Sequence, residues 1–230
     1  MKHRYMRYYE GIHSGSQAII YATGPSILKY SSKLEKPGAI HVGMKHVVCH
    51  PDIARKLHYY FCGDWNNRIR QYYKDLFTFY PLKAKFAYTQ IGTKCGTGSP
   101  TCTKKSSQYW YMSPEFAQSL DMKEYTIAKK FGRWHKDIAS NPFVHAGSTV
   151  FPALQFLLYT GVSQILLVGC DCTNKYSFAE NGQPRKDDLA TIWKRYWKEF
   201  AKFAEREYNN VEILWINPVG ITDLFAQCSL

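Results

Sequence analysis

Two aspartates follow short apolar runs of the sequence, at positions where a carboxylate could take part in chemistry. Asp64 comes directly after Gly63, and Asp171 comes two residues after Gly169, in each case where an apolar run has just ended. A carboxylate placed there can bind a ribose hydroxyl, hold a divalent cation or orient a catalytic group. A helix or turn cap explains either residue alone equally well. Their shared position after apolar runs favours a common site.

A short polar turn follows the first apolar run, at Thr23, Gly24, Pro25 and Ser26. Gly24 allows the backbone to come close to a ligand, and Ser26 can cap a helix or bind a phosphate or a ribose hydroxyl. A purely structural turn is the alternative. We treat all four residues as candidates for nucleotide binding.

A histidine and a basic loop complete the set of candidate residues. His145 lies just before a Gly-Ser-Thr sequence, and an imidazole suits the role of general base because it titrates near neutral pH. A solvated loop histidine is the alternative. Farther along the chain, a polar loop contains Lys175, Tyr176 and Arg185. Phenol and cationic groups of this kind can stabilise charge on a phosphate leaving group, although an ordinary basic surface loop has the same composition.

The cysteines and the remaining histidines do not predict a metal centre. The seven cysteines are scattered along the chain, and the histidines near Cys49 do not match a known zinc spacing. The thiols are expected to be reduced, as in a reducing compartment. We therefore predict no bound metal and no cofactor.

The composition predicts a folded protein with an anionic partner. The chain has 230 residues, of which 45% are hydrophobic and 21% charged, enough for a substantial core. Thirty Lys and Arg residues against 18 Asp and Glu residues give a net charge of +12, so the surface should attract nucleotides, nucleic acid, acidic glycan or lipid headgroups. The basic residues 1–10 are not followed by an apolar segment, so we expect no signal peptide and a cytoplasmic protein.

Apolar runs that alternate with helical patterns predict an α/β fold. Strands are expected at 17–22, 39–42, 58–62, 164–168 and 211–216. Helices are expected at 27–34, 51–57, 113–130, 149–159 and 187–208. This order predicts one Rossmann-like domain over residues 1–230, with a doubly wound, mostly parallel sheet, helices on both faces, and a lid or insertion at 91–142.

The most apolar stretch of the sequence, 149–168, is nearly long enough to cross a membrane. It contains Pro152 and Gly161 and changes its periodicity in the middle. A buried helix followed by a buried strand therefore explains it better than a membrane span.

The predicted sheet would bring the candidate turns together. In an open parallel sheet, ligands bind beyond the carboxyl ends of the strands, where helix N-termini present unpaired N–H groups. The turns that hold Thr23, Asp64, Ser148 and Asp171 lie at such ends. We expect these turns to converge on one crevice shaped for a nucleoside and its phosphates.

Three segments of the chain resemble a known group of enzymes. The segments are Ile20–Ile27 (IYATGPSI), Gly147–Asp171 and Ile216–Phe225 (INPVGITDLF). They are similar to the small bacterial sialyltransferases that use CMP-sialic acid, and to the related 6-hydroxymethylpterin diphosphokinase-like proteins. The resemblance implies a Rossmann-like nucleotide-binding domain with a lid. It also implies metal-independent transfer of a sugar from a CMP donor, with inversion at the anomeric carbon.

The resemblance implies a role for several of the candidate residues. By position, Thr23–Ser26 would cradle the nucleotide, Ser148 and Thr149 would line the donor cleft, and Tyr176 would meet the leaving phosphate. Thr23 stands where the sialyltransferase pattern has asparagine.

The sequence also departs from that pattern at other positions. Gly43, a candidate nucleotide-binding residue by position, replaces an expected asparagine, and Thr173 lies near the place of a second phosphate-binding tyrosine. The loop at 173–188 lacks the histidine that serves those enzymes as base. His145 or Asp171 would then take that role, or the donor and reaction differ.

The resemblance and the charge together predict a glycosyltransferase. It would move sialic acid or a related acidic sugar from a CMP-linked donor to a bacterial or viral surface glycan such as lipopolysaccharide. The basic surface would hold an anionic glycan or glycolipid acceptor, or the headgroups at the inner face of a membrane. One alternative is pyrophosphokinase-like transfer from ATP, with Asp64 and Asp171 binding Mg²⁺. The other is a nucleic-acid-binding module without turnover, which would bind polynucleotide tightly and with a steep salt dependence.

Overall fold

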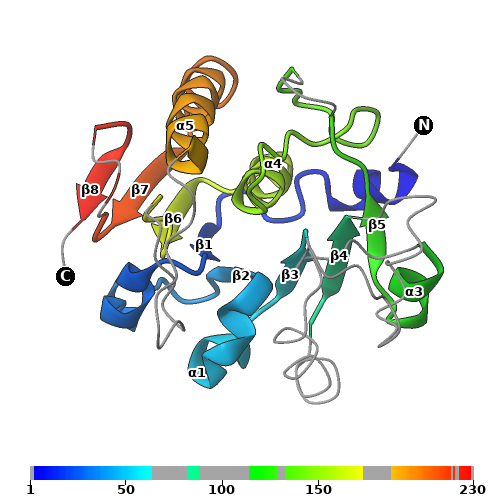
Figure 1. Cartoon of the computed structure of the whole chain (residues 1–230), viewed down its shortest axis with the longest axis horizontal. Helices are drawn as coiled ribbons and strands as arrows, with labels where there is room; N and C mark the ends of the chain where they lie inside the picture. The colour runs from blue at the N-terminus through cyan, green and yellow to red at the C-terminus, as the bar shows by residue number, and fades with distance from the viewer. Residues whose placement is uncertain are drawn as a thin grey trace.

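The strands form one all-parallel sheet (Figure 1). The computed structural model describes residues 3–63, 82–88, 114–128, 133–172, 188–218, 220 and 223–228. Within these residues, eight strands pair in the order β5-β4-β3-β2-β1-β6-β7-β8. Their bounds are β1 (Gln17–Tyr21), β2 (Ile40–Met44), β3 (Tyr59–Cys62), β4 (Ala84–Tyr88), β5 (Lys123–Tyr125), β6 (Gln164–Val168), β7 (Glu212–Ile216) and β8 (Ala226–Cys228). The predicted α/β class with a parallel sheet is confirmed.

The order of the strands reverses once, between β1 and β6. From β1 the chain adds β2 to β5 in one direction, then returns to pair β6 with the other side of β1 and continues to β8. The register places Ile20 opposite Val42 on one side and Leu167 on the other. In open parallel sheets this reversal opens a crevice at the carboxyl ends of the two strands.

Continuous apolar runs form the central strands because both of their faces are covered. Alternate residues of β1 and β6 belong to different core clusters, with Ile20 and Leu167 in one and Ile19 and Leu166 in the other. All five residues of β1 are buried. A strand that is buried on both faces shows no polar alternation, which is why these runs are easily recognised in the sequence.

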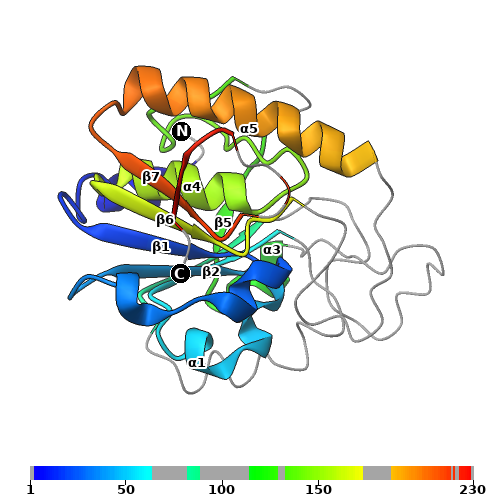
Figure 2. The same cartoon turned by 90° about the vertical axis from the view of Figure 1, so that its left-hand side faces the viewer.

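Helical segments pack against the sheet through these two clusters (Figures 1 and 2). The α-helices are α1 (Pro51–Ala54), α3 (Pro114–Ser119), α4 (Val150–Tyr159) and α5 (Asp188–Glu207). The 3₁₀ segments are η1 (Arg4–Tyr9), η2 (Pro25–Lys29), η3 (Ser32–Leu34) and η4 (Lys45–Cys49). Helices α4 and α5 share one cluster, and ring contacts such as Phe151–Trp197 at 5.0 Å join them. Residues of η2, η4, α1 and α3 belong to the other cluster.

The helix expected at 113–130 is wrong over its second half. Helix α3 ends at Ser119, Asp121 turns the chain with a φ of 52°, and Lys123–Tyr125 forms β5 beside β4. Tyr125 is fully buried, with its ring 5.9 Å from Phe61. Burial of this ring in the sheet outweighs the local helical pattern.

One further expectation differs from the structure, and another is described only in part. The helix expected at 27–34 consists of the short segments η2 and η3, because Tyr30 between them is extended, with ψ at 136°. Within the interval expected to form a lid, 91–142, residues 114–119 and 123–125 form α3 and β5. Residues 91–113 lie outside the described residues.

The apolar stretch at 149–168 contains α4 and β6, as the sequence predicts. All ten residues of α4 are buried. Across the described ranges, no helix combines the length and the apolar character that are needed to cross a membrane.

Two buried histidines are expected to make the fold sensitive to acid. His13 shares a 2.8 Å hydrogen bond with the Tyr59 hydroxyl, and His41 shares one of 3.0 Å with the Tyr21 hydroxyl. Burial lowers the pKa of both rings from 6.5 to about 4. Between these values the unfolded chain binds protons that the folded protein does not bind, so stability increases with pH.

We therefore expect the free energy of unfolding to fall as the pH is lowered from about 6.5 to about 4. The loss should be roughly 1–3 kcal/mol for each ring. Urea denaturation across this pH range measures it. A His41→Gln variant should lose part of the pH dependence, whereas His135→Gln, outside both pairs, should keep it. A stability that does not change over this range would contradict the prediction.

Candidate functional site

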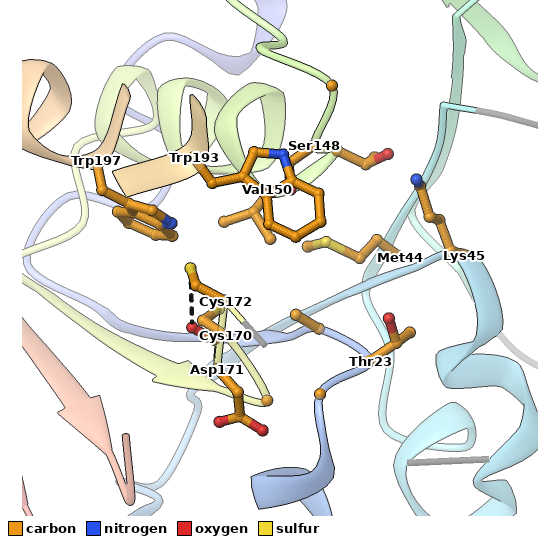
Figure 3. Close-up of a pocket in the computed structure, with 15 residues that line it drawn as sticks. Thr23, Met44, Lys45, Ser148, Val150, Cys170, Asp171, Cys172, Trp193 and Trp197 are labelled. Carbon is orange, nitrogen blue, oxygen red and sulfur yellow. Dashed lines mark hydrogen bonds between the residues drawn. The ribbon is translucent and has the colours of Figure 1, made fainter. Parts of the chain in front are cut away.

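A hollow lies at the carboxyl ends of β1 and β6, where the strand order reverses (Figure 3). Its cavity volume is about 80 Å³, which is smaller than the roughly 300–1,000 Å³ of most small-molecule sites. The lining comes from the ends of β1, β2 and β6, from the start of α4 and from the first half of α5. It consists of Ala22, Thr23, Gly24, Met44, Lys45, Gly147, Ser148, Thr149, Val150, Gly169, Cys170, Asp171, Cys172, Trp193 and Trp197.

The turns after β1 and β6 are bound to each other at the floor of this hollow. The Gly24 N–H donates to the Gly169 carbonyl at 2.8 Å, and the Ser26 N–H donates to Asp171 Oδ2 at 2.7 Å. Gly24 has an ordinary φ of −74°, but a Cβ atom there would lie 2.6 Å from the Gly169 oxygen and 2.5 Å from Asp171 Oδ2. The glycine is therefore required by the contact between the two turns.

Asp171 acts in this arrangement as a cap for η2. Its side chain is 1% exposed, and Figure 3 shows the carboxylate directed away from Trp193. Burial raises the pKa of Asp171, while hydrogen bonds from Ser26 and the positive charge of Lys29 act in the opposite direction. The second oxygen, Oδ1, makes no hydrogen bond within the described part of the chain. The sequence allowed Asp171 to be either a site carboxylate or a cap, and the hydrogen bond from the Ser26 N–H supports the cap.

This geometry predicts different effects for two substitutions of Asp171. Asp171→Ala should lower the free energy of unfolding by about 1–2 kcal/mol, because it leaves the buried Ser26 N–H without an acceptor. Asp171→Asn keeps an acceptor oxygen and removes a charge that burial disfavours, so it should cost much less. Urea denaturation at neutral pH compares the two variants. Equal destabilisation by both would mean that the fold needs the negative charge itself.

A strained turn positions the start of α4. The Ser148 N–H donates to the His145 carbonyl at 2.7 Å, and the two residues between them have positive φ values, 47° at Ala146 and 72° at Gly147. Positive φ values at two successive residues are typical of a tight turn. Residues other than glycine, such as Ala146, rarely adopt a positive φ. Ser148 and Thr149, which follow this turn, line the hollow, whereas His145 before it does not.

Other positions with unusual backbone surround the same edge of the sheet. Five non-glycine residues in the described ranges have a positive φ. Lys45 and Asn217 come immediately after β2 and β7, and Cys172 comes shortly after β6. Ala146 precedes α4. Such strain is concentrated at functional sites in proteins. Its distribution therefore favours the hollow as the site of function.

The hollow combines an apolar wall with a cationic rim. Trp193, Trp197 and Met44 are buried and form the wall. Lys45 lies on the rim, on the side where Figure 3 shows the Ser148 hydroxyl. The Lys45 carbonyl accepts a 2.7 Å hydrogen bond from the Tyr60 hydroxyl, which holds the backbone of the turn in place.

Sequence reasoning missed these wall and rim residues. Trp193 and Trp197 have the spacing of a core face on α5 and are indeed 8% and 3% exposed, yet the same rings border the hollow. Lys45 was detectable, because it is the first charged residue after the apolar run at 39–42. The tryptophans gave no signal beyond ordinary helix amphipathicity.

The structure brings part of the predicted site together. Thr23, Gly24, Ser148, Thr149 and Asp171 all line the hollow. Pro25 and Ser26 form the first residues of η2, directly behind the turn. Asp64, Thr173, Lys175, Tyr176 and Arg185 lie outside the described residues, so their predicted roles stay predictions.

Two of the predicted site residues lie elsewhere. Gly43 is inside β2, where a Cβ atom would lie 2.6 Å from Leu57 Cδ1 and 2.7 Å from Val47 Cγ1. The packing of η4 and the segment after α1 therefore explains the glycine. His145 adjoins the hollow without lining it, and its ring stacks on Tyr88 at 6.0 Å, at the end of β4.

The cysteines of the site are not activated nucleophiles. Cys170 and Cys172 are free thiols at the end of β6. Burial raises the pKa of both, that of Cys172 to about 12. Within the described ranges there is no group of three His, Cys, Asp or Glu residues with the geometry of a metal site.

The chain matches no protein-family model, no curated protein and no solved structure. The functional interpretation therefore depends on the geometry and chemistry of the hollow.

Proposed function

We propose that this protein is a glycosyltransferase that binds a nucleotide-sugar donor, CMP-linked, in the hollow between β1 and β6. The observation that carries the proposal is the position and lining of the hollow. It lies at the reversal of a parallel sheet, and it combines an aromatic wall, a lysine and the start of α4. Open parallel sheets bind nucleotides at this point.

The two parts of the hollow suit the two parts of a nucleotide sugar. Trp193, Trp197 and Met44 offer apolar surface for a base or a sugar ring. The Lys45 ammonium, the Ser148 hydroxyl and the N-terminus of α4 suit the phosphate, because a cation, a hydroxyl donor and a helix dipole all favour negative charge. These groups stabilise the charge that develops on the leaving phosphate as the glycosidic bond breaks.

The remaining roles in the proposed reaction follow from the sequence predictions. His145 is the general base, and Tyr176, Lys175 and Arg185 contact the leaving phosphate. Asp171 holds the turn after β1 through Ser26, a role that does not need a metal ion. The transfer is a single displacement with inversion.

The proposed acceptor is an anionic surface glycan or glycolipid. A net charge of +12 favours such an acceptor, and it also favours contact with the anionic headgroups at the inner face of a membrane. In this proposal the protein works in the cytoplasm.

A thermal-shift comparison of CMP, UDP, GDP and ATP, each with and without Mg²⁺, tests the proposed function. CMP should raise the melting temperature independently of Mg²⁺, by the equivalent of about 2.7 kcal/mol at a hundred times its dissociation constant. Lys45→Met should lose most of this shift, because it removes the cation at the rim. Lys33→Met, on the exposed surface of η3, is the matched control and should keep the shift.

Other results would support the alternative functions. A shift with ATP only in the presence of Mg²⁺ would favour pyrophosphokinase-like chemistry. Binding of polynucleotide with a steep salt dependence, and no shift with any mononucleotide, would favour a nucleic-acid-binding module. Either result would contradict the proposed glycosyltransferase.

A further inference from the structure

The solvent-facing side of α5 carries a row of lysines. Lys194, Lys198 and Lys202 follow one another at intervals of four residues, and all three are exposed. Residues four apart lie on the same side of an α-helix, about 6 Å from one another along its axis. Figure 2 shows α5 on the outside of the molecule, beyond α4 and the sheet. The row therefore faces solvent over about two helical turns.

The ion pairs on this side of the helix leave the row positively charged. Arg195 pairs with Glu199 at 3.0 Å, and Arg206 pairs with Glu207 at 2.7 Å. Among the residues that the structure describes, none of the three lysines forms an ion pair. Glu205, three residues after the last lysine, is exposed as well. Three ammonium groups against one carboxylate give this face a net positive charge.

An open groove runs beside the second half of α5, between this helix and the edge of the sheet at β8. Its cavity volume is about 430 Å³, larger than that of the hollow and within the range of small-molecule sites. Apart from Glu205 and Asn209, its lining is apolar or aromatic and includes Ala201, Leu224, Phe225 and Ala226. The groove therefore offers mainly apolar side chains to a ligand.

The lysine row and the groove are adjacent on the surface of α5. Lys198 comes three residues before Ala201, and Lys202 comes three residues before Glu205. Residues three apart are neighbours on a helix surface, and both Ala201 and Glu205 line the groove. A ligand with its apolar part in the groove would therefore have ammonium groups beside it. Cationic groups next to apolar surface fit an amphipathic anion.

A polynucleotide fits this face less well than a lipid does. Proteins that hold single strands without reading their sequence stack the bases on exposed aromatic rings. The rings of α5 in its described part are buried, namely Trp193, Tyr196, Trp197, Phe200 and Phe203. The rings of Tyr208 and Phe225 at the groove are half-buried and pack on Phe203 and Trp215. Charge and apolar lining together favour a lipid.

We propose that this face binds an anionic membrane phospholipid, with its phosphate group at Lys198 and Lys202 and an acyl chain in the groove. The inference rests on the membrane contact in the proposed function, and it adds the surface and the class of lipid. Helix α5 connects this face to the hollow, because Trp193 and Trp197 in its first half border the hollow. A protein held through α5 carries the hollow at the membrane, where a glycolipid acceptor lies.

Co-sedimentation of the full chain with lipid vesicles tests the inference. We expect binding to phosphatidylcholine vesicles that contain phosphatidylglycerol, and much weaker binding to phosphatidylcholine alone. The double variant Lys198→Gln, Lys202→Gln should lower the affinity for the anionic vesicles about 10- to 30-fold. Glu205→Gln should raise this affinity, because it removes the carboxylate beside the lysines.

The matched control is the double variant Lys33→Gln, Lys36→Gln. It removes the same charge from exposed positions beside Leu34, which packs against the opposite face of the sheet from α5. It should lower the affinity for the anionic vesicles less than about threefold, because salt screens charges that lie far from the membrane. Both double variants should keep the stabilisation by CMP, since none of these lysines lines the hollow.

Short-chain phospholipids in monomeric form test the groove without a membrane. Dihexanoyl phosphatidylglycerol should raise the melting temperature of the protein, because it binds the folded state. Glycerol 3-phosphate, which carries a phosphate without acyl chains, should not raise it at the same concentration. Ala201→Gln places a polar side chain in the groove and keeps a good helix former. It should remove most of the shift, with little effect on the melting temperature of the free protein.

Four results would overturn the inference. Equal binding to both kinds of vesicle would mean that the lipid charge is not recognised. Equal losses in the two double variants would mean that only the total charge matters. Equal shifts with glycerol 3-phosphate and with the short-chain lipid would assign an anion site without a groove. Binding of polynucleotide through Lys198 and Lys202, without binding of vesicles, would make this face a nucleic-acid surface.

Failure of the proposed function is recognised separately from failure of the lipid site. The wild-type protein would then show no stabilisation by CMP, whereas the vesicle and short-chain lipid measurements need no nucleotide.

Discussion

His145→Ala is expected to lower the rate of donor hydrolysis by roughly 10²- to 10⁴-fold, the usual contribution of a general base. The affinity for CMP should change by less than about twofold, because His145 adjoins the hollow without lining it. A loss of rate at constant donor affinity is the signature of a group that acts in the transition state and not in donor binding. Single-turnover hydrolysis of CMP-sialic acid and CMP thermal shifts measure the two quantities.

His135→Ala provides the matched control for this prediction. His135 lies in the connector at 133–142 and is not among the residues that line the hollow. Its removal should leave both the rate and the CMP affinity unchanged. If His145→Ala hydrolyses the donor at the wild-type rate, the base is another residue, and Asp171→Asn becomes the variant that tests the other candidate from the sequence.

Gly24→Ala is expected to lower the free energy of unfolding by about 2–4 kcal/mol. The added methyl group would collide with the Gly169 carbonyl and with the Asp171 carboxylate. The first of these is backbone and cannot move aside without shifting the end of β6. The turn after β1 would then separate from the turn after β6, so CMP binding should be lost in the molecules that still fold.

Gly38→Ala separates this effect from the general cost of replacing a glycine. Gly38 has nothing within 4 Å of its Cβ position, but its φ of 76° disfavours any side chain. Its replacement should cost only about 1 kcal/mol, from backbone strain alone. Urea denaturation compares the two variants. If Gly24→Ala is no less stable than Gly38→Ala, the two turns are not in the close contact described above.

The sequence predicted the central strands and helices well, because the residues that are apolar in the sequence there are also the residues that the fold buries. The run Gln164–Val168 is apolar throughout and is buried as β6, and the long amphipathic pattern before Glu207 is α5. Gly161, with a φ of 83°, ends the helical segment before β6 as expected from its sequence. Local patterns of this length leave few alternative structures.

The edges of the sheet could not be predicted in the same way. The segment Lys123–Tyr125 has only three residues and a mixed polar pattern, and it becomes a strand because Tyr125 packs against Phe61 and Phe143. β8 is equally short and mostly exposed. Such strands are determined by the neighbour that they pair with, which no local window of sequence contains.

The candidate site, like the fold, was predictable from the sequence only in part. By itself, the sequence determined that polar turns follow apolar strands and that parallel strands bring such turns to one edge, because chain direction alone dictates that convergence. Only the tertiary structure decided which side chain faces which space. It paired Asp171 with Ser26, placed Gly43 in the core, added Lys45 and Trp193 to the hollow, and directed Thr149 and His145 toward Gly63. Those assignments depend on contacts between residues that are far apart in the chain, and such contacts exist only once the sheet has formed.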